Sequence, residues 1–172
     1  RQLLSVLNQV IPTGLHDNDL YQSCALIKNS ELGSDSPMSA YRAYLNGEPT
    51  ALAVEAIAPD GYNGAIKIIV GVKQDGVISG TRVLSQQETP GLGDKIDLRI
   101  SDWILGFTGK KVTEDNLSTW KVRKDGGQFD QFTGATITPR AVVKAVKKTV
   151  EFVNQNREQI LLQSSDCGGT NE

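Results

Sequence analysis

The residues with the clearest chemical potential lie in the segment 130–140, which reads DQFTGATITPR. Thr138 before Pro139 predicts a helix start, because a threonine hydroxyl can cap the first turn and proline loses no hydrogen bond there. The free N–H groups at such an end favour an anion, especially a phosphate. Thr136 therefore places a hydroxyl where a phosphoester could form. Capping alone would also explain this pattern, so both interpretations stay open.

Small and basic neighbours of Thr136 extend the hypothesis. Gly134 and Ala135 would let a bulky ligand approach the backbone. Arg140 and Lys144 follow within the next turn or so and add positive charge that an anion would favour. The segment thus combines a hydroxyl, space and positive charge at one predicted helix end.

A second candidate segment is the loop 88–95, which reads ETPGLGDK. Pro90-Gly91 is a typical type II turn pair, and Gly93 adds another position without a Cβ atom. Such a loop can bring backbone N–H groups close to a flat ligand. The same residues would also suit an ordinary turn from a strand to a helix.

Several side chains in and near this loop could contact such a ligand. Glu88 or Thr89 could hydrogen-bond to its polar atoms, while Leu92 packs on its ring. Tyr62, in an earlier turn, could stack on the ring or simply pack against the protein. We find no nucleophile paired with a base and no cluster of metal ligands, so a bound cofactor would have to supply the chemistry.

Charge and hydropathy narrow the function classes. The chain of 172 residues has 18 Lys and Arg against 20 Asp and Glu, for a net charge of -2. The absence of a basic stripe argues against nucleic acid as a partner. No apolar run approaches the roughly 20 residues that cross a bilayer. Because the chain begins at Arg1 and its one methionine is Met38, we expect that an upstream signal or membrane anchor is missing from it.

The two cysteines, Cys24 and Cys167, match neither a metal site nor a Cys-x-x-Cys motif. They are either two buried thiols or a disulfide. A disulfide would close a loop of about 143 residues and stabilise the fold by roughly 4–5 kcal/mol. It would also place the domain outside the cytoplasm. His16, the only histidine, has no second ligand nearby and is expected at the surface.

The first half of the chain predicts one helix and an antiparallel sheet. Apolar positions in residues 1–11 form a helical stripe that Pro12 ends, and residues 13–40 are mixed, with a short apolar stretch at 24–27. Four strands joined by short turns follow. They comprise a hairpin at 40–58 around Asn46-Gly47, a strand at 65–72 with Ile66, Ile68 and Val70 on one face, and a strand at 77–87. Consecutive strands with short turns predict a meander rather than a parallel Rossmann sheet.

The second half is predicted to be mainly helical. Residues 94–109 look like one helix ending at Gly109, and a short strand is expected at 120–123. The last helix opens at Thr138-Pro139, with a break expected between Asn154 and Arg157. The tail 163–172 is expected to be irregular. Without a repeat or linker, residues 1–172 predict a single α+β domain, an antiparallel meander sheet flanked by helices.

Three motifs resemble the FMN-binding domain family. The pattern Asp130-x-x-Thr133-Gly134-Ala135-Thr136 looks like the acceptor motif of covalently flavinylated proteins, in which a flavin transferase moves FMN from FAD to the last threonine. Residues 88–95 are similar to the ETPGLG loop in the G component of the Rnf electron transport complex. Gly61-Tyr62-Asn63-Gly64 before the 65–72 strand is typical of the same domain, which the C component of sodium-translocating NADH:quinone reductase shares.

The resemblance covers the chain from the Asn46 turn to the last helix and includes Cys24 in its DLYQSC context. Gln86-Gln87 departs from the histidine expected just before the loop in many relatives, which concerns a secondary contact only.

The resemblance implies a covalent FMN, linked through its phosphate to Thr136. Asp130, Gly134 and Ala135 would also be recognised by the flavin transferase, and Thr133 and Thr138 are the nearest alternative acceptors. The cofactor-binding residues that it implies are Thr136, Thr133, Gly134, Ala135, Glu88, Thr89, Leu92, Gly93, Lys95, Tyr62 and Asp130.

As a function, the resemblance implies an electron-carrying subunit of an ion-translocating oxidoreductase complex in the cell inner membrane. The soluble domain would lie on the periplasmic side, tied to the membrane by the missing N-terminal anchor, and its partners would be the other subunits. Such a protein would not turn over a substrate alone. One alternative is an extracytoplasmic binding or scaffold domain of the same fold without flavin, and another is a stand-alone FMN reductase.

Overall fold

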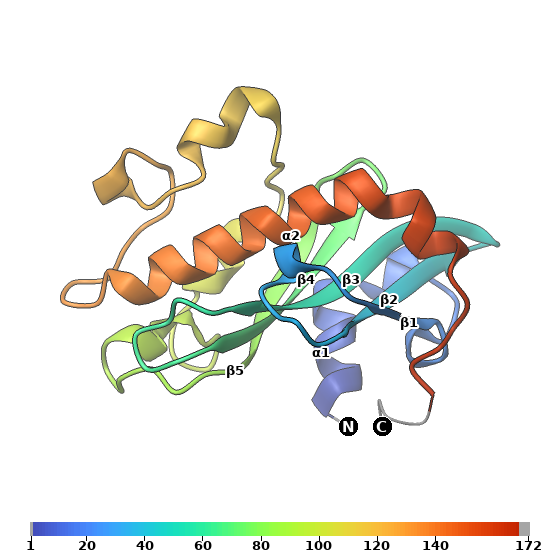
Figure 1. Cartoon of the computed structure of the whole chain (residues 1–172), viewed down its shortest axis with the longest axis horizontal. Helices are drawn as coiled ribbons and strands as arrows, with labels where there is room; N and C mark the ends of the chain where they lie inside the picture. Colours follow the sequence, from blue (N-terminus) through green and yellow to red (C-terminus); the bar gives the residue numbers. More distant parts are fainter. Residues whose placement is uncertain (1, 169–172) are drawn as a thin grey trace.

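Five antiparallel strands form one sheet in which spatial order follows chain order (Figure 1). The computed structural model describes residues 2–168. Its main elements are α1 (Gln2–Val10), β1 (Cys24–Ile27), β2 (Met38–Leu45), β3 (Glu48–Ala58), β4 (Ile66–Lys73), β5 (Ile78–Ser85) and α2 (Ile137–Leu162). Short 3-10 helices lie in the connections. The predicted α+β class and the meander sheet are therefore confirmed.

Tight turns set the register of this sheet. Asn46 and Gly47 both have positive φ, 53° and 80°, as a two-residue hairpin turn requires, and they join β2 to β3. The strand that the sequence did not predict is β1, where Cys24 pairs with Tyr41 of β2. Four residues are too short for a clear alternation, so β1 depends on its pairing with β2 rather than on its own sequence.

Both faces of the sheet are buried, and successive strand residues point to opposite faces. Leu52, Val54 and the even-numbered apolar residues of β4 pack under α2 in the larger core. Tyr41, Ala53 and Ile69 pack in a second core with Leu7 and Val10 of α1. Figure 1 shows α2, coloured orange to red, lying across its face of the sheet. The fold is thus a helix–sheet–helix sandwich with one long helix.

Glycines in β4 and β5 let α1 approach the sheet closely. A Cβ atom on Gly71 would lie 2.4 Å from the carbonyl oxygen of Val10, and one on Gly80 would lie 2.8 Å from the Cα atom of Val10. The hydroxyl of Ser79, the residue before Gly80 in β5, donates to the carbonyl oxygen of Val10 at 2.6 Å. Any larger residue at either glycine would push α1 away.

The predicted helix at 94–109 is wrong. The chain instead forms two short 3-10 helices, Gly93–Ile96 and Trp103–Phe107, with a turn between them. The Asp97 carboxylate accepts from the backbone N–H of Arg99 at 2.9 Å, and the Ser101 hydroxyl accepts from that of Trp103 at 3.1 Å. These side-chain bonds take donors that a continuous helix would use for its own ladder.

The predicted strand at 120–123 is also wrong. Val122 makes one isolated bridge to Phe129, and the chain turns into a 3-10 helix at Arg123–Asp125. Aromatic packing holds this region instead, with ring centroids 4.9 Å apart for Trp120 and Phe129 and 4.8 Å for Phe107 and Phe129. Rings that pack on one another in this way need no strand pairing.

The long helix confirms one prediction and corrects another. Its backbone leaves helical geometry at Asn156, within the predicted break between Asn154 and Arg157. The helix begins at Ile137, however, and Thr138 does not cap it. The Thr138 hydroxyl is 1% exposed and donates to the Glu88 carboxylate, so it is not available to the helix backbone.

The far end of α2 is tied to the sheet by a disulfide. Cys24 of β1 and Cys167 are bonded, which decides between the two interpretations of the cysteines.

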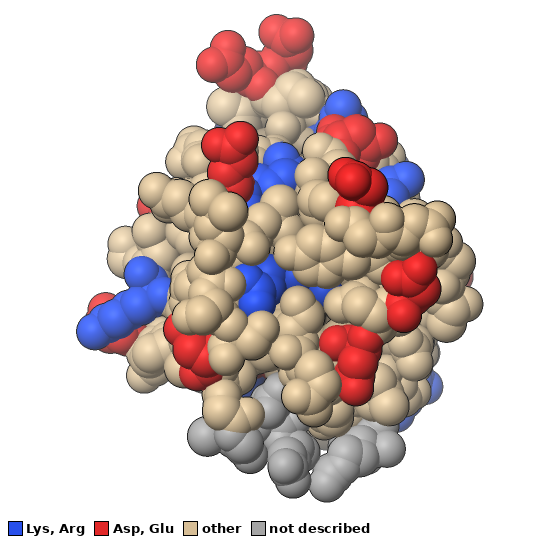
Figure 2. All heavy atoms as spheres, turned by 90° about the vertical axis from the view of Figure 1, so that its right-hand side faces the viewer, with Lys and Arg blue, Asp and Glu red and all other residues tan. Residues whose placement is uncertain are grey.

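His16 is half-buried rather than a plain surface residue, with its Nδ1 atom 3.1 Å from the carbonyl oxygen of Asn18. Residues 164–168 of the tail are irregular as expected, and 169–172 lie outside the described residues. Figure 2 shows acidic and basic side chains interspersed over one end of the molecule.

Within residues 2–168, no helix combines the length and the apolar character that a membrane span requires.

Candidate functional site

Thr136 is the N-cap residue that directly precedes α2, and it is half-buried. The first helical hydrogen bond runs from Arg140 N to Thr136 O at 3.2 Å. The amide groups of Ile137 and Thr138 precede that bond, so they have no acceptor within the helix, and Pro139 has no amide N–H to satisfy. The Thr136 hydroxyl makes no hydrogen bond with any described residue. A free hydroxyl and free backbone donors therefore meet at one helix end.

A tight turn leads the chain into this helix end. Ala135 N donates to Phe132 O at 3.1 Å, and Gly134, with φ of 75°, occupies the turn position that favours glycine. Thr133 is exposed on the same turn. A Cβ atom on Gly134 would lie 3.7 Å from Leu92 Cδ2, so the turn faces the loop 88–95.

The loop 88–95 packs directly on the first turn of α2. Gly91 N donates to Asp94 Oδ1 at 2.9 Å, which closes the loop on itself. A Cβ atom on Gly93 would lie only 2.4 Å from Thr138 Oγ1 and 3.0 Å from Glu88 Cβ. Since real Cβ atoms do not approach so closely, only glycine allows this loop to touch the helix here.

The Glu88 carboxylate joins three segments that are far apart in the sequence. It is 5% exposed and accepts from Tyr62 N at 2.9 Å, from Asn63 N at 3.0 Å and from Thr138 Oγ1 at 2.5 Å. Asn63 Nδ2 also donates to Thr89 Oγ1 at 3.1 Å. Both oxygens of Glu88 thus bond to the protein itself. Its predicted contact with a flat ligand stays a prediction.

Large apolar side chains stay exposed around this helix end. The Tyr62 side chain is 64% exposed, that of Ile137 is 47% and that of Leu92 is 39%. Lys95 is half-buried and makes no ion pair with the described part of the chain. The surface beside Thr136 therefore offers apolar contact area and, among residues 2–168, a cation without an acidic partner.

Asp130 lies just outside this group and supports the turn. Its carboxylate accepts from Arg123 Nε at 2.6 Å, and its carbonyl accepts from the indole N–H of Trp103 at 2.8 Å. Trp103 also packs edge-on against Phe132, with ring centroids 5.4 Å apart. Sequence reasoning missed Trp103, because no local motif links it to a turn 27 residues later.

The two cations expected beside the helix end are paired with acids. Arg140 binds both Asp125 oxygens, at 2.7 and 2.8 Å, and its hydrogen bonds hold the pKa of Asp125 below its usual value. Lys144 Nζ lies 3.1 Å from Asp60 Oδ2. Positive charge is thus present near Thr136, but most of it is already balanced.

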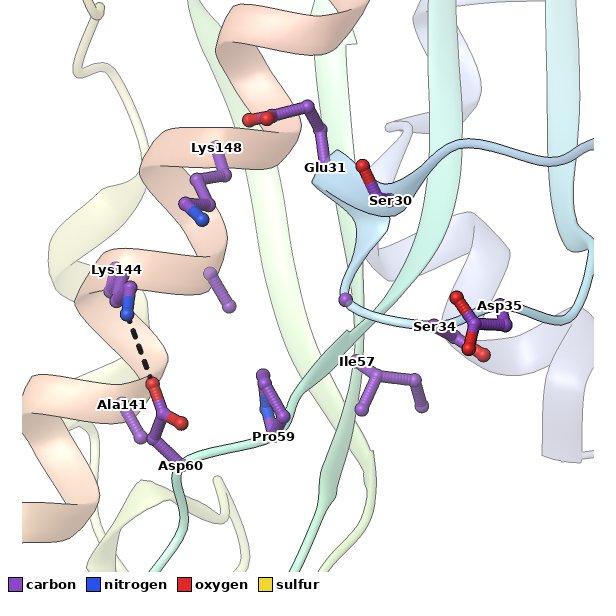
Figure 3. A pocket seen from close by; sticks show the side chains of 12 residues that line it. Ser30, Glu31, Ser34, Asp35, Ile57, Pro59, Asp60, Ala141, Lys144 and Lys148 are labelled. Carbon is purple, nitrogen blue, oxygen red and sulfur yellow. Dashed lines mark hydrogen bonds and ion pairs between the residues drawn. The ribbon is translucent and has the colours of Figure 1, made fainter.

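A separate cavity of about 310 Å³ flanks α2. Figure 3 shows Lys144, Lys148 and Ala141 of α2 on one side, facing the 3-10 helix Ser30–Leu32 and the end of β3. None of the cofactor-binding residues implied by the sequence lines it. The residues around Thr136 form an open surface rather than part of this cavity.

The arrangement at Thr136 suits a ligand with a phosphate and a flat apolar ring. The unbonded hydroxyl and the free amides could hold the phosphate, since helix N-termini favour anions. Exposed apolar side chains such as Leu92 and Tyr62 could contact a ring. The fold brings together the predicted site residues Tyr62, those of the loop 88–95 and those of the turn 133–136, although these three segments are separate in sequence.

Comparison with known proteins adds independent information. Residues 61–151 match the family described as FMN-binding domain. The chain is 71% identical over 168 residues to the G component of the ion-translocating oxidoreductase complex of Vibrio atlanticus (strain LGP32), covering 98% of this chain and 80% of that protein. The protein of the same name from Vibrio cholerae (strain O395) is 64% identical over 169 residues, with 98% and 81% covered. The one from Aliivibrio fischeri (strain MJ11) is 60% identical over 168 residues, with 97% and 80% covered.

Proposed function

Since this chain belongs to the family of FMN-binding domains, with FMN as its cofactor, we propose that Thr136 carries the FMN through a phosphoester. The protein is the electron-transport G component of an ion-translocating oxidoreductase complex, and the covalent flavin is the electron carrier that it contributes. When bound, FMN supplies the redox chemistry, and the protein attaches and orients it.

The observation that carries this proposal is the state of three neighbouring threonine hydroxyls. Thr138 is buried and donates to Glu88, while Thr133 sits on the exposed turn before the helix. Thr136 alone of the three combines an unbonded hydroxyl with a position at the start of α2. A phosphate on that oxygen would face the free amides of Ile137 and Thr138, which favour its negative charge.

The attachment step transfers a phosphoryl group and moves no electrons. With FAD as the donor and a flavin transferase as the catalyst, Thr136 Oγ1 forms a bond to the phosphorus on the FMN side. The bond from that phosphorus to the bridging oxygen breaks, AMP leaves, and the hydroxyl proton is released. The small residues Gly134 and Ala135 leave the backbone open for the transferase to approach.

The disulfide supports a location on the periplasmic side of the membrane. Bonds such as Cys24–Cys167 persist in oxidising compartments and are rare in the cytosol. An open cofactor surface suits a relay in which other subunits of the complex donate and accept the electrons. The described residues show no cluster of three or more potential metal ligands.

The test is co-expression with a flavin transferase and export to the periplasm, followed by intact mass and in-gel flavin fluorescence. Wild type should gain one FMN, Thr136→Ser should keep some, and Thr136→Ala should gain none. Thr133→Ala is the matched control for the acceptor and should still be labelled, whereas Thr138→Val should be labelled more slowly. Labelled Thr136→Ala protein would move the attachment site. Unlabelled wild type would leave a domain of this fold without covalent flavin, and rapid NADH turnover by the isolated domain would indicate a reductase.

A further inference from the structure

We propose that Glu88 is a positioning residue for the attachment of FMN. Its buried carboxylate holds the start of α2 in place and thereby presents the Thr136 hydroxyl to the incoming phosphorus atom. The inference rests on the proposed attachment at Thr136, but it assigns Glu88 a role through the protein rather than through contact with the flavin.

The hydrogen bonds of Glu88 suit a carboxylate and no other side chain. An ionised carboxylate only accepts, and here it faces three donors, which are Tyr62 N, Asn63 N and Thr138 Oγ1. Oε1 accepts from Tyr62 N and Thr138, while Oε2 accepts from Asn63 N. A glutamine would turn an N–H₂ group toward at least one donor, and an alanine would leave all three without their acceptor.

Close packing makes the contact of Glu88 and Gly93 with Thr138 rigid. Thr138 is 1% exposed, Glu88 is 5% exposed, and Gly93 leaves no room for a Cβ atom between them. Charge-assisted hydrogen bonds in such a dry place are stronger than those in water. The first turn of α2 therefore cannot move independently of the loop 88–95.

This contact lies close to the proposed acceptor. Thr138 is two residues after Thr136, within the same first turn. Without the hydrogen bond from Thr138 to Glu88, the first turn of α2 can fray, because helix ends have few hydrogen bonds of their own. The Thr136 hydroxyl would then sample many positions, and a transfer reaction that depends on orientation would slow.

The test compares Glu88→Ala, Glu88→Gln and Thr138→Val with wild type in a reaction of purified flavin transferase and FAD. Glu88→Ala should lower kcat for FMN attachment about tenfold or more, because a displaced acceptor reacts slowly. The KM for the protein should change little, since the motif from Asp130 to Thr136 is intact. Glu88→Gln should recover part of kcat, because one oxygen still accepts. Thr138→Val should fall between Glu88→Ala and wild type, since it removes one of the three bonds.

Glu55→Gln is the matched control. Glu55 is also a buried carboxylate, 7% exposed, but it pairs with Lys67 at 3.3 Å and lies near Tyr41, on the sheet face opposite α2. Burial of Tyr41 raises the pKa of its hydroxyl, and the charge of Glu55 raises that pKa further. Glu55→Gln should lower stability without lowering kcat for attachment.

Amide hydrogen exchange supplies a readout that needs no cofactor. Glu88→Ala should speed exchange at Tyr62 and Asn63, whereas Glu55→Gln should not. Unchanged exchange in Glu88→Ala, or faster exchange with wild-type kcat, would overturn the role of Glu88. A similar loss of kcat in Glu55→Gln would also overturn it. Wild type that accepts no FMN would instead overturn the proposed function.

Discussion

The two ends of α2 are held in different ways. At its N-terminal end, hydrogen bonds from Glu88 and close packing at Gly93 hold the helix to irregular loops. At its C-terminal end, the Cys24–Cys167 disulfide and the guanidinium of Arg42 tie the helix and tail to the sheet. The first end leaves a hydroxyl and apolar side chains free, while the second is cross-linked by the disulfide and by the hydrogen bonds of Arg42.

Arg42 shows how complete the bonding at the second end is. It is 4% exposed and donates to the carbonyls of Ser23, Ile160 and Gln163 and to the Ser165 hydroxyl. This difference indicates that the two ends of α2 serve different purposes. The disulfide end stabilises the fold, so the end beside Thr136, where we propose that FMN is attached, can keep polar groups unbonded at some cost in stability.

The disulfide gives the largest test of this comparison. Replacing Cys24 and Cys167 together with alanine should lower the free energy of unfolding by roughly 4–5 kcal/mol, because the bond closes a long loop in the unfolded chain. FMN attachment at room temperature should not change. Urea unfolding and in-gel fluorescence measure the two effects, and reduced wild type serves as a control. Loss of attachment in the folded double variant would show that the ends are coupled.

Arg42→Met should have the next largest effect. Removing the buried guanidinium takes its hydrogen bonds from the carbonyls of Ile160 and Gln163, whereas that of Ser23 keeps the Arg42 backbone N–H, and should cost about 3 kcal/mol of unfolding free energy. The control is Arg82→Met on β5, whose side chain bonds to Gln9 and to its neighbour Thr81 and is partly exposed. Equal losses in urea unfolding for the two variants would argue against a special role for Arg42.

Gly93→Ala tests the end of α2 beside Thr136. The new methyl group would lie 2.4 Å from Thr138 Oγ1, so the loop must shift, at a cost of about 2 kcal/mol. Unlike the two changes above, it should also slow FMN attachment. Gly106→Ala is the control, because a Cβ atom there meets nothing within 4 Å. Normal attachment in Gly93→Ala would mean that the contact between loop and helix is dispensable.

The smallest effect should come from the exposed pair Arg140–Asp125. Arg140 lowers the folded-state pKa of Asp125 below the usual 3.8, so the pair stabilises the fold above that pH. This contribution is lost as pH falls through the lowered pKa. Asp125→Asn should therefore unfold at slightly lower urea at neutral pH and match wild type in strong acid, as urea titrations at several pH values can measure. A gap that persists in acid would contradict the pairing.

Much of the fold could be predicted because its signals are local. The Asn46-Gly47 turn, the alternation in β3 and β4, and the break at Asn156 all follow from residues close in sequence. The failures have local reasons as well. Asp97 and Ser101 bond to nearby amides and interrupt the expected helix, and these short-range competitors are difficult to weigh against helical periodicity.

The candidate site was predictable in its residue types but not in its connections. The acceptor motif and the loop 88–95 were recognisable by resemblance alone. The partner of Thr138 is Glu88, 50 residues earlier, and no spacing rule points to it. Arg140 and Lys144 were expected to face an anion, yet each is paired with an acid distant in sequence.

Local sequence is sufficient to establish strands β2 to β5, the long helix and the presence of three hydroxyls near its start, since backbone propensity and side-chain period act over a few residues. Which of those hydroxyls stays unbonded depends on the folded chain. Glu88 reaches Thr138 only because β4, β5 and α2 pack around one core and bring their ends together. The same packing places Cys24 and Cys167 with Cα atoms 5.6 Å apart, a distance that sequence separation cannot predict.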